Sequence, residues 1–117
     1  MKYMIMIYSN PKSRAVWEGF TDAEREEGWN KHRALVADIA AAGDLVTVEG
    51  LADPETAKRV TVRDGQLYVT DGPYAETKEY LAGFFLVDCA SEAAALAYAS
   101  RIPEANAGLV EVRAIVS

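Results

Sequence analysis

The sequence predicts a mixed α+β fold, and three observations lead to this prediction. Two uninterrupted apolar runs, residues 4–8 and 81–87, have the length and composition of buried strands. Two helix-forming segments each follow a hydroxyl residue that can cap a helix. The Asp64-Gly65 pair is a signal for a tight hairpin. With 117 residues, half of them hydrophobic, the chain has the size of one domain, which we expect to span residues 1–117.

The N-terminal third is expected to contain one strand and one long helix. The apolar residues 4–8 form a strand suited to the centre of a sheet. Thr21 and Glu24 have the spacing of a capping box, in which a hydroxyl and a carboxylate satisfy the first free amides of a helix. A helix is therefore expected over residues 22–42, ended by Gly43.

The middle of the chain is expected to form short strands. Residues 46–51 and 60–63 are β-prone runs, separated by a turn at residues 52–55. The Asp64-Gly65 turn leads into residues 66–70, which we expect to pair with the strand before it. This part of the chain therefore adds a small hairpin.

The C-terminal third is expected to form a strand, a helix and a last strand. Residues 81–87 form a buried strand, and Ser91 caps an alanine-rich helix over residues 92–101 that Pro103 stops. Residues 109–116 form the last strand. Without the small hairpin, the order is β-α-β-β-α-β, the ferredoxin-like arrangement with both helices on one face of an antiparallel sheet.

The other face of such a sheet needs a cover. Because the strand at residues 81–87 is apolar on both faces, a single chain would expose a large hydrophobic surface. We expect a second copy of the chain to cover it, so that the protein is a homodimer.

The charge and composition exclude several classes of function. A net charge of -6 and a pI near 4.7 disfavour broad binding to nucleic acids and to anionic membranes. No apolar run approaches the roughly 20 residues that span a bilayer, and residues 3–8 are too few for a signal peptide. The single cysteine, Cys89, cannot form an internal disulfide and is expected to be a small buried side chain. We expect a cytoplasmic protein.

His32, the single histidine, is the first candidate for chemistry. On a helix it shares a stripe with Trp29, Val36, Ile39 and Ala40, so its imidazole is expected to face the sheet. Imidazole is the side chain that most readily takes up and releases a proton at neutral pH. A core histidine held by a carbonyl or a carboxylate fits the same pattern.

Asp71 is the expected partner of His32, and Asp44, just beyond the helix end, is the rival. An aspartate fixed in a turn can hold one tautomer of an imidazole and stabilise its protonated form. The Asp71 carboxylate can instead accept amide hydrogens from the following residues, while Gly72 and Pro73 shape the loop. The residue types alone are compatible with both roles.

Four further residues are candidates for ligand binding. Tyr8 ends the first strand, and Tyr74, Glu76 and Lys78 follow Asp71 closely. The tyrosines offer hydroxyl groups to a pocket, and Lys78 offers a positive charge to an anionic ligand. Packed rings and exposed Lys-Glu contacts explain the same residues without a ligand.

The residue pattern does not indicate a metal or a cofactor. One histidine and one cysteine do not make a zinc cluster, and the chain has no glycine-rich phosphate loop or dinucleotide fingerprint. No serine lies in a nucleophile-elbow motif. Cofactor-independent chemistry is what remains for an enzyme of this composition.

Residues 71–79, which read Asp-Gly-Pro-Tyr-Ala-Glu-Thr-Lys-Glu, are the most specific motif in the chain. They resemble the signature of the YCII-related, or DGPF-domain, family, which has a phenylalanine where this chain has Tyr74. The likeness extends over nearly the whole chain, through Met1-Lys2-Tyr3-Met4, Val48-Glu49-Gly50-Leu51 and Val110-Glu111-Val112-Arg113.

This resemblance implies a dimeric α+β barrel, in which the sheets of two copies pack face to face. Related proteins carry a histidine at the place of His32, which is proposed to work with an aspartate. The first hypothesis is therefore a cofactor-independent lyase or isomerase, in which His32 and Asp71 transfer a proton on a small polar or cyclic substrate. Members of the family are often encoded beside, or fused to, sigma-factor-like regulators. The alternative is a non-catalytic ligand-binding or regulatory accessory protein.

Overall fold

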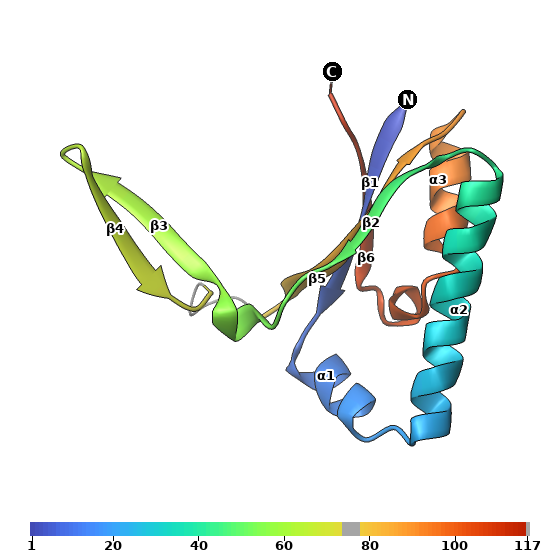
Figure 1. Ribbon diagram of the computed structural model, residues 1–117, viewed down its shortest axis with the longest axis horizontal. Helices are drawn as coiled ribbons and strands as arrows, with labels where there is room; N and C mark the ends of the chain where they lie inside the picture. The colour runs from blue at the N-terminus through green and yellow to red at the C-terminus, as the bar shows by residue number, and fades with distance from the viewer. Residues whose placement is uncertain (74–77, 117) are drawn as a thin grey trace.

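The computed structural model describes residues 1–73 and 78–116 and contains a four-stranded sheet, helices on one of its faces and a separate hairpin (Figure 1). Two short 3-10 helices, η1 and η2, complete it. The elements follow the chain as β1 (Lys2–Ser9), α1 (Pro11–Glu18), α2 (Asp22–Ala41), β2 (Leu45–Gly50), η1 (Pro54–Thr56), β3 (Lys58–Arg63), β4 (Gln66–Asp71), β5 (Tyr80–Asp88), α3 (Glu92–Ala99), η2 (Pro103–Ala107) and β6 (Val110–Ala114).

The sheet has the strand order β2-β5-β1-β6, and each neighbouring pair is antiparallel. The two inner strands, β1 and β5, contain the two apolar runs of the sequence, because an inner strand is shielded by neighbours on both sides. This order and the helix positions are those of a ferredoxin-like fold. The predicted fold class, α+β with an added hairpin, is confirmed.

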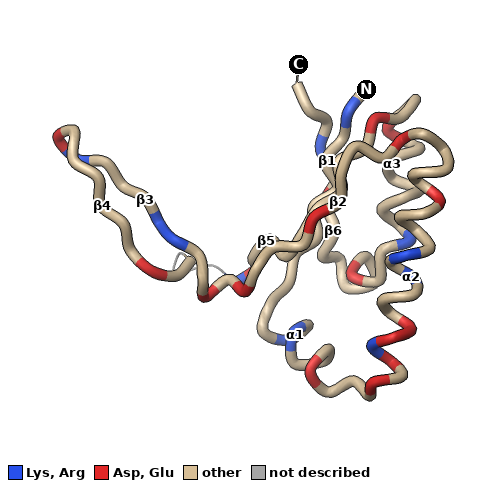
Figure 2. The backbone as a smooth tube through the Cα atoms, in the orientation of Figure 1, with Lys and Arg blue, Asp and Glu red and all other residues tan. Residues whose placement is uncertain are grey.

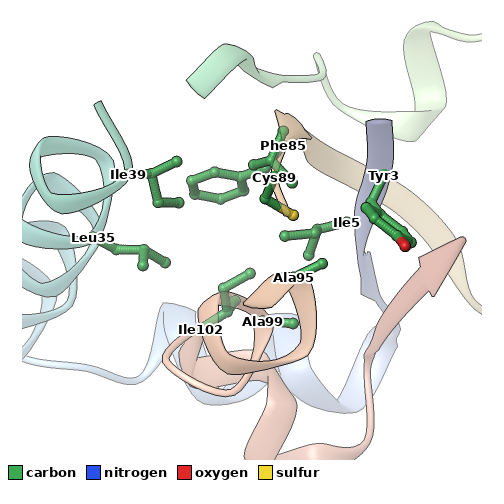
Figure 3. Packing of buried hydrophobic residues seen from close by; sticks show 10 residues of the cluster. Tyr3, Ile5, Leu35, Ile39, Phe85, Cys89, Ala95, Ala99 and Ile102 are labelled. Atoms are coloured by element: carbon green, nitrogen blue, oxygen red, sulfur yellow. The ribbon is translucent and has the colours of Figure 1, made fainter. Parts of the chain in front are cut away.

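The hydrophobic core lies between the helices and one face of the sheet. Leu35 and Ile39 of α2 point toward Phe85 of β5 and Ile5 of β1, and none of the four is more than 2% exposed (Figure 3). Cys89 lies in the same cluster and is buried, as predicted. The core therefore fixes α2 across the centre of the sheet.

Helix α2 begins and ends where its caps predict. The Thr21 hydroxyl accepts a hydrogen bond from the Glu24 amide (3.1 Å), and the Glu24 carboxylate accepts one from the Thr21 amide (2.9 Å). Two residues after the helix, Gly43 adopts φ of +79°, a left-handed conformation that favours glycine. These contacts set the length of the helix that carries His32.

Helix α1 lies outside the predicted elements. Asn10 caps it by accepting a hydrogen bond from the Ser13 amide (2.8 Å), and Ser13 accepts one from the Asn10 amide (3.0 Å). Pro11, which marks the end of the strand in the sequence, is also suited to the first position of a helix, where no amide hydrogen is needed. The helix brings Arg14 and Trp17 to one end of the sheet.

The predicted hairpin is confirmed as β3 and β4, which we call the arm (residues 58–71). Asp64 and Gly65 at its tip both have positive φ, 51° and 76°, as a tight two-residue turn requires. The arm pairs with no strand of the main sheet. It extends away from the sheet, on the side opposite to α2 and α3 (Figure 1).

The open face of the sheet, which carries no helix, is apolar along its two inner strands. Met4 and Met6 of β1 lie opposite Leu86 and Phe84 of β5, and all four side chains are half-buried. Their neighbours in sequence, such as Ile5 and Phe85, point to the helices, because successive residues of a strand face opposite sides. Both faces of the inner strands are therefore apolar, as the sequence predicts.

Candidate functional site

A solvent-open groove lies at the end of the sheet where β2 ends and β5 begins. It consists of two adjoining hollows of about 180 and 340 Å³. Six residues line both hollows: Leu51, Ala52, Asp53, Pro54, Tyr80 and Leu81. The walls are mostly apolar with a few polar groups, which is the composition of small-molecule sites.

The backbone around the groove is held by specific contacts. The Leu51 amide donates to the Ala82 carbonyl (2.8 Å), which keeps the two walls at a fixed separation. The register of β1 with β5 shifts beyond Ile7, so that Tyr8 lies opposite Leu81. Such a bulge bends the strand and redirects its side chains. One wall of the groove is therefore the start of β5, and the other is the connection that follows β2, which the hydrogen bond from Leu51 to Ala82 holds against β5.

One charged pair spans the smaller hollow. Two nitrogens of the Arg14 guanidinium donate to the two carboxylate oxygens of Asp53, one of them at 3.4 Å. Asp53 also accepts a hydrogen bond from the Glu55 amide (3.1 Å), and Arg14 donates to Glu18 on its own helix (3.3 Å). The pair thus joins α1 to the turn after β2.

These contacts shift the pKa of both partners toward the charged form. The hydrogen bond from Arg14, and next the amide of Glu55, lower the pKa of Asp53 below its ordinary value. The Asp53 carboxylate, and next the Tyr80 side chain, raise the pKa of Arg14. Both side chains are therefore charged at neutral pH, and the Tyr80 side chain lies beside them.

His32 lies outside the groove, on the helix side of the sheet. Its ring is half-buried and packs edge to face against Phe85 of the core (centroids 5.6 Å apart) and against Trp29 (6.0 Å). Trp29 in turn contacts Trp17 of α1 (5.7 Å). The predicted orientation of His32 toward the sheet agrees with these contacts, and its surroundings are aromatic.

Asp71 lies at the base of the arm, where its carboxylate accepts a hydrogen bond from Lys58 and is largely exposed. The arm and α2 are on opposite sides of the sheet, so a single chain does not bring Asp71 to His32 (Figure 1). Asp44 is held elsewhere, by a hydrogen bond from the Tyr98 hydroxyl (2.7 Å). That bond, followed by burial, raises the pKa of Tyr98. Neither aspartate is paired with His32 in the described contacts.

The other predicted ligand residues are divided between two surfaces. Tyr8 is half-buried, and its hydroxyl contacts the Met6 sulfur (3.6 Å) on the open face. Lys78 is exposed in the segment that leads to Tyr80. Tyr74 and Glu76 lie outside the described residues.

Arg14, Asp53 and Tyr80 line the groove but are not among the sequence candidates. Arg14 belongs to α1, whose signal was the Asn10-Pro11 start of a helix. Asp53 precedes a proline and caps η1, so that its residue type is explained by turn chemistry alone. Tyr80 directly follows the 71–79 motif. Its position next to that motif is the feature of the sequence that could have identified it as a candidate.

No group of three or more His, Cys, Asp or Glu side chains in residues 1–73 and 78–116 is arranged to hold a metal ion. In the same part of the chain, no helix combines the length and apolar character needed to cross a membrane.

Comparison with known proteins identifies the family. The family model of the YCII-related domain matches residues 1–117. An uncharacterized protein of Rhizobium meliloti (strain 1021) is 35% identical over 115 residues, which cover 97% of this chain and 90% of that protein. The resemblance of the 71–79 motif is thus supported over the whole length, and the chain belongs to the YCII-related family.

Proposed function

We propose that the protein binds a small, mostly apolar ring compound with one hydrogen-bonding substituent in the groove. The observation that carries this proposal is the combination of apolar walls with one polar cluster, Arg14, Asp53 and Tyr80. Leu51, Pro54 and Leu81 suit the ring, and the polar cluster suits its substituent. The larger hollow, about 340 Å³, falls in the size range of small-ligand sites.

The charges of the cluster narrow the choice of substituent. Arg14 is already held by Asp53 and Glu18, so the cluster as a whole is not cationic. An anionic substituent would face two carboxylates, whereas a hydroxyl or carbonyl group can accept from Arg14 or exchange hydrogen bonds with Tyr80. We therefore favour a neutral phenol or cyclic ketone as the ligand class.

The test is a titration of the labelled protein with phenol, cyclohexanone and benzoate, followed by amide NMR. Phenol or cyclohexanone should shift the signals of residues 51–56 and 80–82 and leave those of α3 unchanged. Tyr80→Phe should weaken the binding roughly threefold to tenfold, the worth of one hydrogen bond. Tyr68→Phe, at an exposed tyrosine of the arm, is the matched control. Stronger binding of benzoate, or shifts confined to other regions, would contradict the proposal.

A second candidate function is proton transfer by His32, as the sequence suggests. The observation that favours it is the half-buried ring, which is close enough to solvent to exchange protons. In this proposal the carboxylate that orients His32 would be Asp71 of a second chain, or another residue would take the place of Asp71. The absence of described contacts between His32 and the groove residues makes ligand binding the better supported function.

A test separates the two candidates. If His32 is catalytic, solvent deuterium should enter the carbon next to the carbonyl group of cyclohexanone faster with the protein than without it. His32→Phe should abolish that exchange and leave binding in the groove unchanged. No exchange above the uncatalysed rate would remove this second candidate.

We also propose that the protein is a homodimer in which the open sheet faces of two copies meet. The half-buried Met4, Met6, Phe84 and Leu86 support this arrangement, since water-exposed apolar sheet faces of this kind are usually covered. The family resemblance implies the same packing.

A further inference from the structure

The arm has one apolar face that the described residues of its own chain leave exposed. Val60 lies opposite Val69, and Val62 lies opposite Leu67. Because residues alternate along a strand, these four side chains share a face. Each is between 53% and 65% exposed. The arm is therefore a ribbon with a hydrophobic stripe turned to solvent.

The other face of the arm is polar. Thr61 lies opposite Tyr68, and the Arg63 guanidinium lies over the Tyr68 ring at 5.9 Å from its centre. The division into one apolar and one polar face is the pattern of a half-buried sheet. It predicts that the apolar face is covered in the working form of the protein.

The arm needs this cover for its own stability. A two-stranded hairpin is marginally stable in water on its own. At the base, the Gly72 amide donates to the Ala57 carbonyl (2.7 Å), and Lys58 pairs with Asp71. These contacts close the base but do not bury the stripe of valines and leucine above it.

The position of the arm indicates what covers it. The arm extends on the same side of the sheet as the open apolar face (Figure 1). A second copy that packs on the open face occupies the space between sheet and arm. Such a copy would lie beside the arm, and one interface would then cover both apolar surfaces.

The distribution of charge favours the same occupant. Residues 58–71 contain three basic and two acidic residues, a net charge of +1, while the whole chain carries -6. The remaining residues therefore carry -7. Figure 2 shows basic residues along β3 and acidic residues at η1 and at the start of α2. A weakly basic arm is attracted to the acidic body of another copy.

We infer that the arm packs its apolar face, Val60, Val62, Leu67 and Val69, on a second copy of this chain and clasps the homodimer. This inference rests on the homodimer proposed above. It adds a specific segment to that interface, and by symmetry each copy extends its arm to the other.

The test compares two neighbouring positions of β3 that face opposite sides. Val62→Glu places a carboxylate in the stripe, and Thr61→Glu places one on the polar face. Each variant adds one negative charge to the chain, so the two differ chiefly in the face that carries it. Sedimentation equilibrium should show the unmodified chain and Thr61→Glu at twice the chain mass of 12.7 kDa. Val62→Glu should dimerise at least roughly tenfold more weakly, since a buried unpaired carboxylate is costly.

Amide hydrogen exchange of the unmodified chain gives a second measurement that does not depend on a variant. The amides of β3 and β4 should exchange slowly in concentrated protein and rapidly after dilution into the monomer range, because the isolated ribbon opens readily. The amides of β1 and β5 should stay protected in both conditions.

The outcomes separate the arm from the rest of the proposal. Dimerisation of Val62→Glu as tight as that of the unmodified chain, with arm exchange independent of concentration, overturns the clasp and leaves the sheet-to-sheet dimer standing. A chain that remains monomeric at all concentrations overturns the clasp and the homodimer together. Neither result affects the ligand test on the groove.

Discussion

At the scale of single residues, the groove depends on one ion pair between elements far apart in sequence. Arg14 and Asp53 are each about two-fifths exposed, so water screens their attraction and the pair is a positioning contact more than a source of stability. Its value lies in holding α1 against the turn after β2. The depressed pKa of Asp53 is the measurable sign of this contact.

The first prediction concerns the pH dependence of that contact. The pKa of Asp53 in the folded protein is below the ordinary 3.8, so the stabilisation is complete above that value and is lost as the pH falls through the lower folded pKa. Asp53→Asn should therefore melt below the unmodified protein at neutral pH, and the gap in melting temperature should narrow as the pH falls below 3.8. Circular dichroism melts measure it. Asp64→Asn, which removes a carboxylate at the tip of the arm, is the control, and a constant gap for Asp53→Asn would contradict the assignment.

The second prediction concerns His32 as a packing residue. His32→Asn removes the edge-to-face contacts with Phe85 and Trp29 and should lower the free energy of unfolding by about 1–2 kcal/mol. His32→Phe keeps a ring in the same place and should retain most of the stability. Urea denaturation of the three proteins distinguishes the cases. Equal stability of the Asn and Phe variants would mean that the ring contacts contribute little.

At the scale of elements, the groove depends on the close approach of β2 and β5. Gly83 lies opposite Gly50, and a Cβ added at Gly83 would lie 2.8 Å from the Glu49 carbonyl oxygen. A Cβ added at Gly50 would meet no atom within 4 Å. The close contact therefore concerns Gly83 alone, because a side chain at Gly83 would collide with β2 and a side chain at Gly50 would not collide with β5.

The third prediction uses this asymmetry. Gly83→Ala forces the two strands apart and should lower the free energy of unfolding by about 1–3 kcal/mol, the range for overpacked positions. Gly50→Ala should change it by less than about 0.5 kcal/mol. Chemical denaturation of both variants makes the comparison, since the same atoms are added on neighbouring strands. A similar loss of unfolding free energy at both positions would show that the flexibility of the glycine backbone, and not the lack of space at Gly83, explains the effect.

At the scale of the whole molecule, the chain has apolar surface on two sides of its sheet and helices on one. Folding of one chain covers the side with Ile5 and Phe85 and leaves the side with Met6 and Phe84 half-buried. The dimensions of 49 × 42 × 19 Å describe a flat body with a projecting arm. Such a shape leaves much of the chain at the surface, which favours association.

The fourth prediction tests the open face. Leu86→Lys places a charge between the proposed sheets and should convert the dimer into a monomer that keeps its helix content. Leu96→Lys makes the same change on α3, at a leucine that is 49% exposed, and should leave the dimer intact. Size-exclusion chromatography with light scattering reports the mass, and circular dichroism reports the fold. Dissociation by both variants would point to loss of folding and against a specific interface.

Most of the local structure of this protein follows from signals that lie within a few residues of one another. Thr21 and Glu24 placed the start of α2, Asp64-Gly65 placed the tip of the arm, and the uninterrupted apolar runs marked the inner strands. Each of these signals acts over a few residues, through an amide that needs an acceptor or a backbone that needs a positive φ. The family could also be recognised from the 71–79 motif, because that motif is contiguous.

The contacts between distant residues could not be read from the sequence. Arg14 and Asp53 are 39 residues apart, and the sequence around either residue does not indicate that the two form a pair. His32 and Asp71 looked like partners by residue type, but the sheet lies between their elements (Figure 1). Asp44 is held by Tyr98, which is 54 residues away. Long-range pairs depend on how strands and helices pack in space, and the chemistry of a single residue does not contain that information.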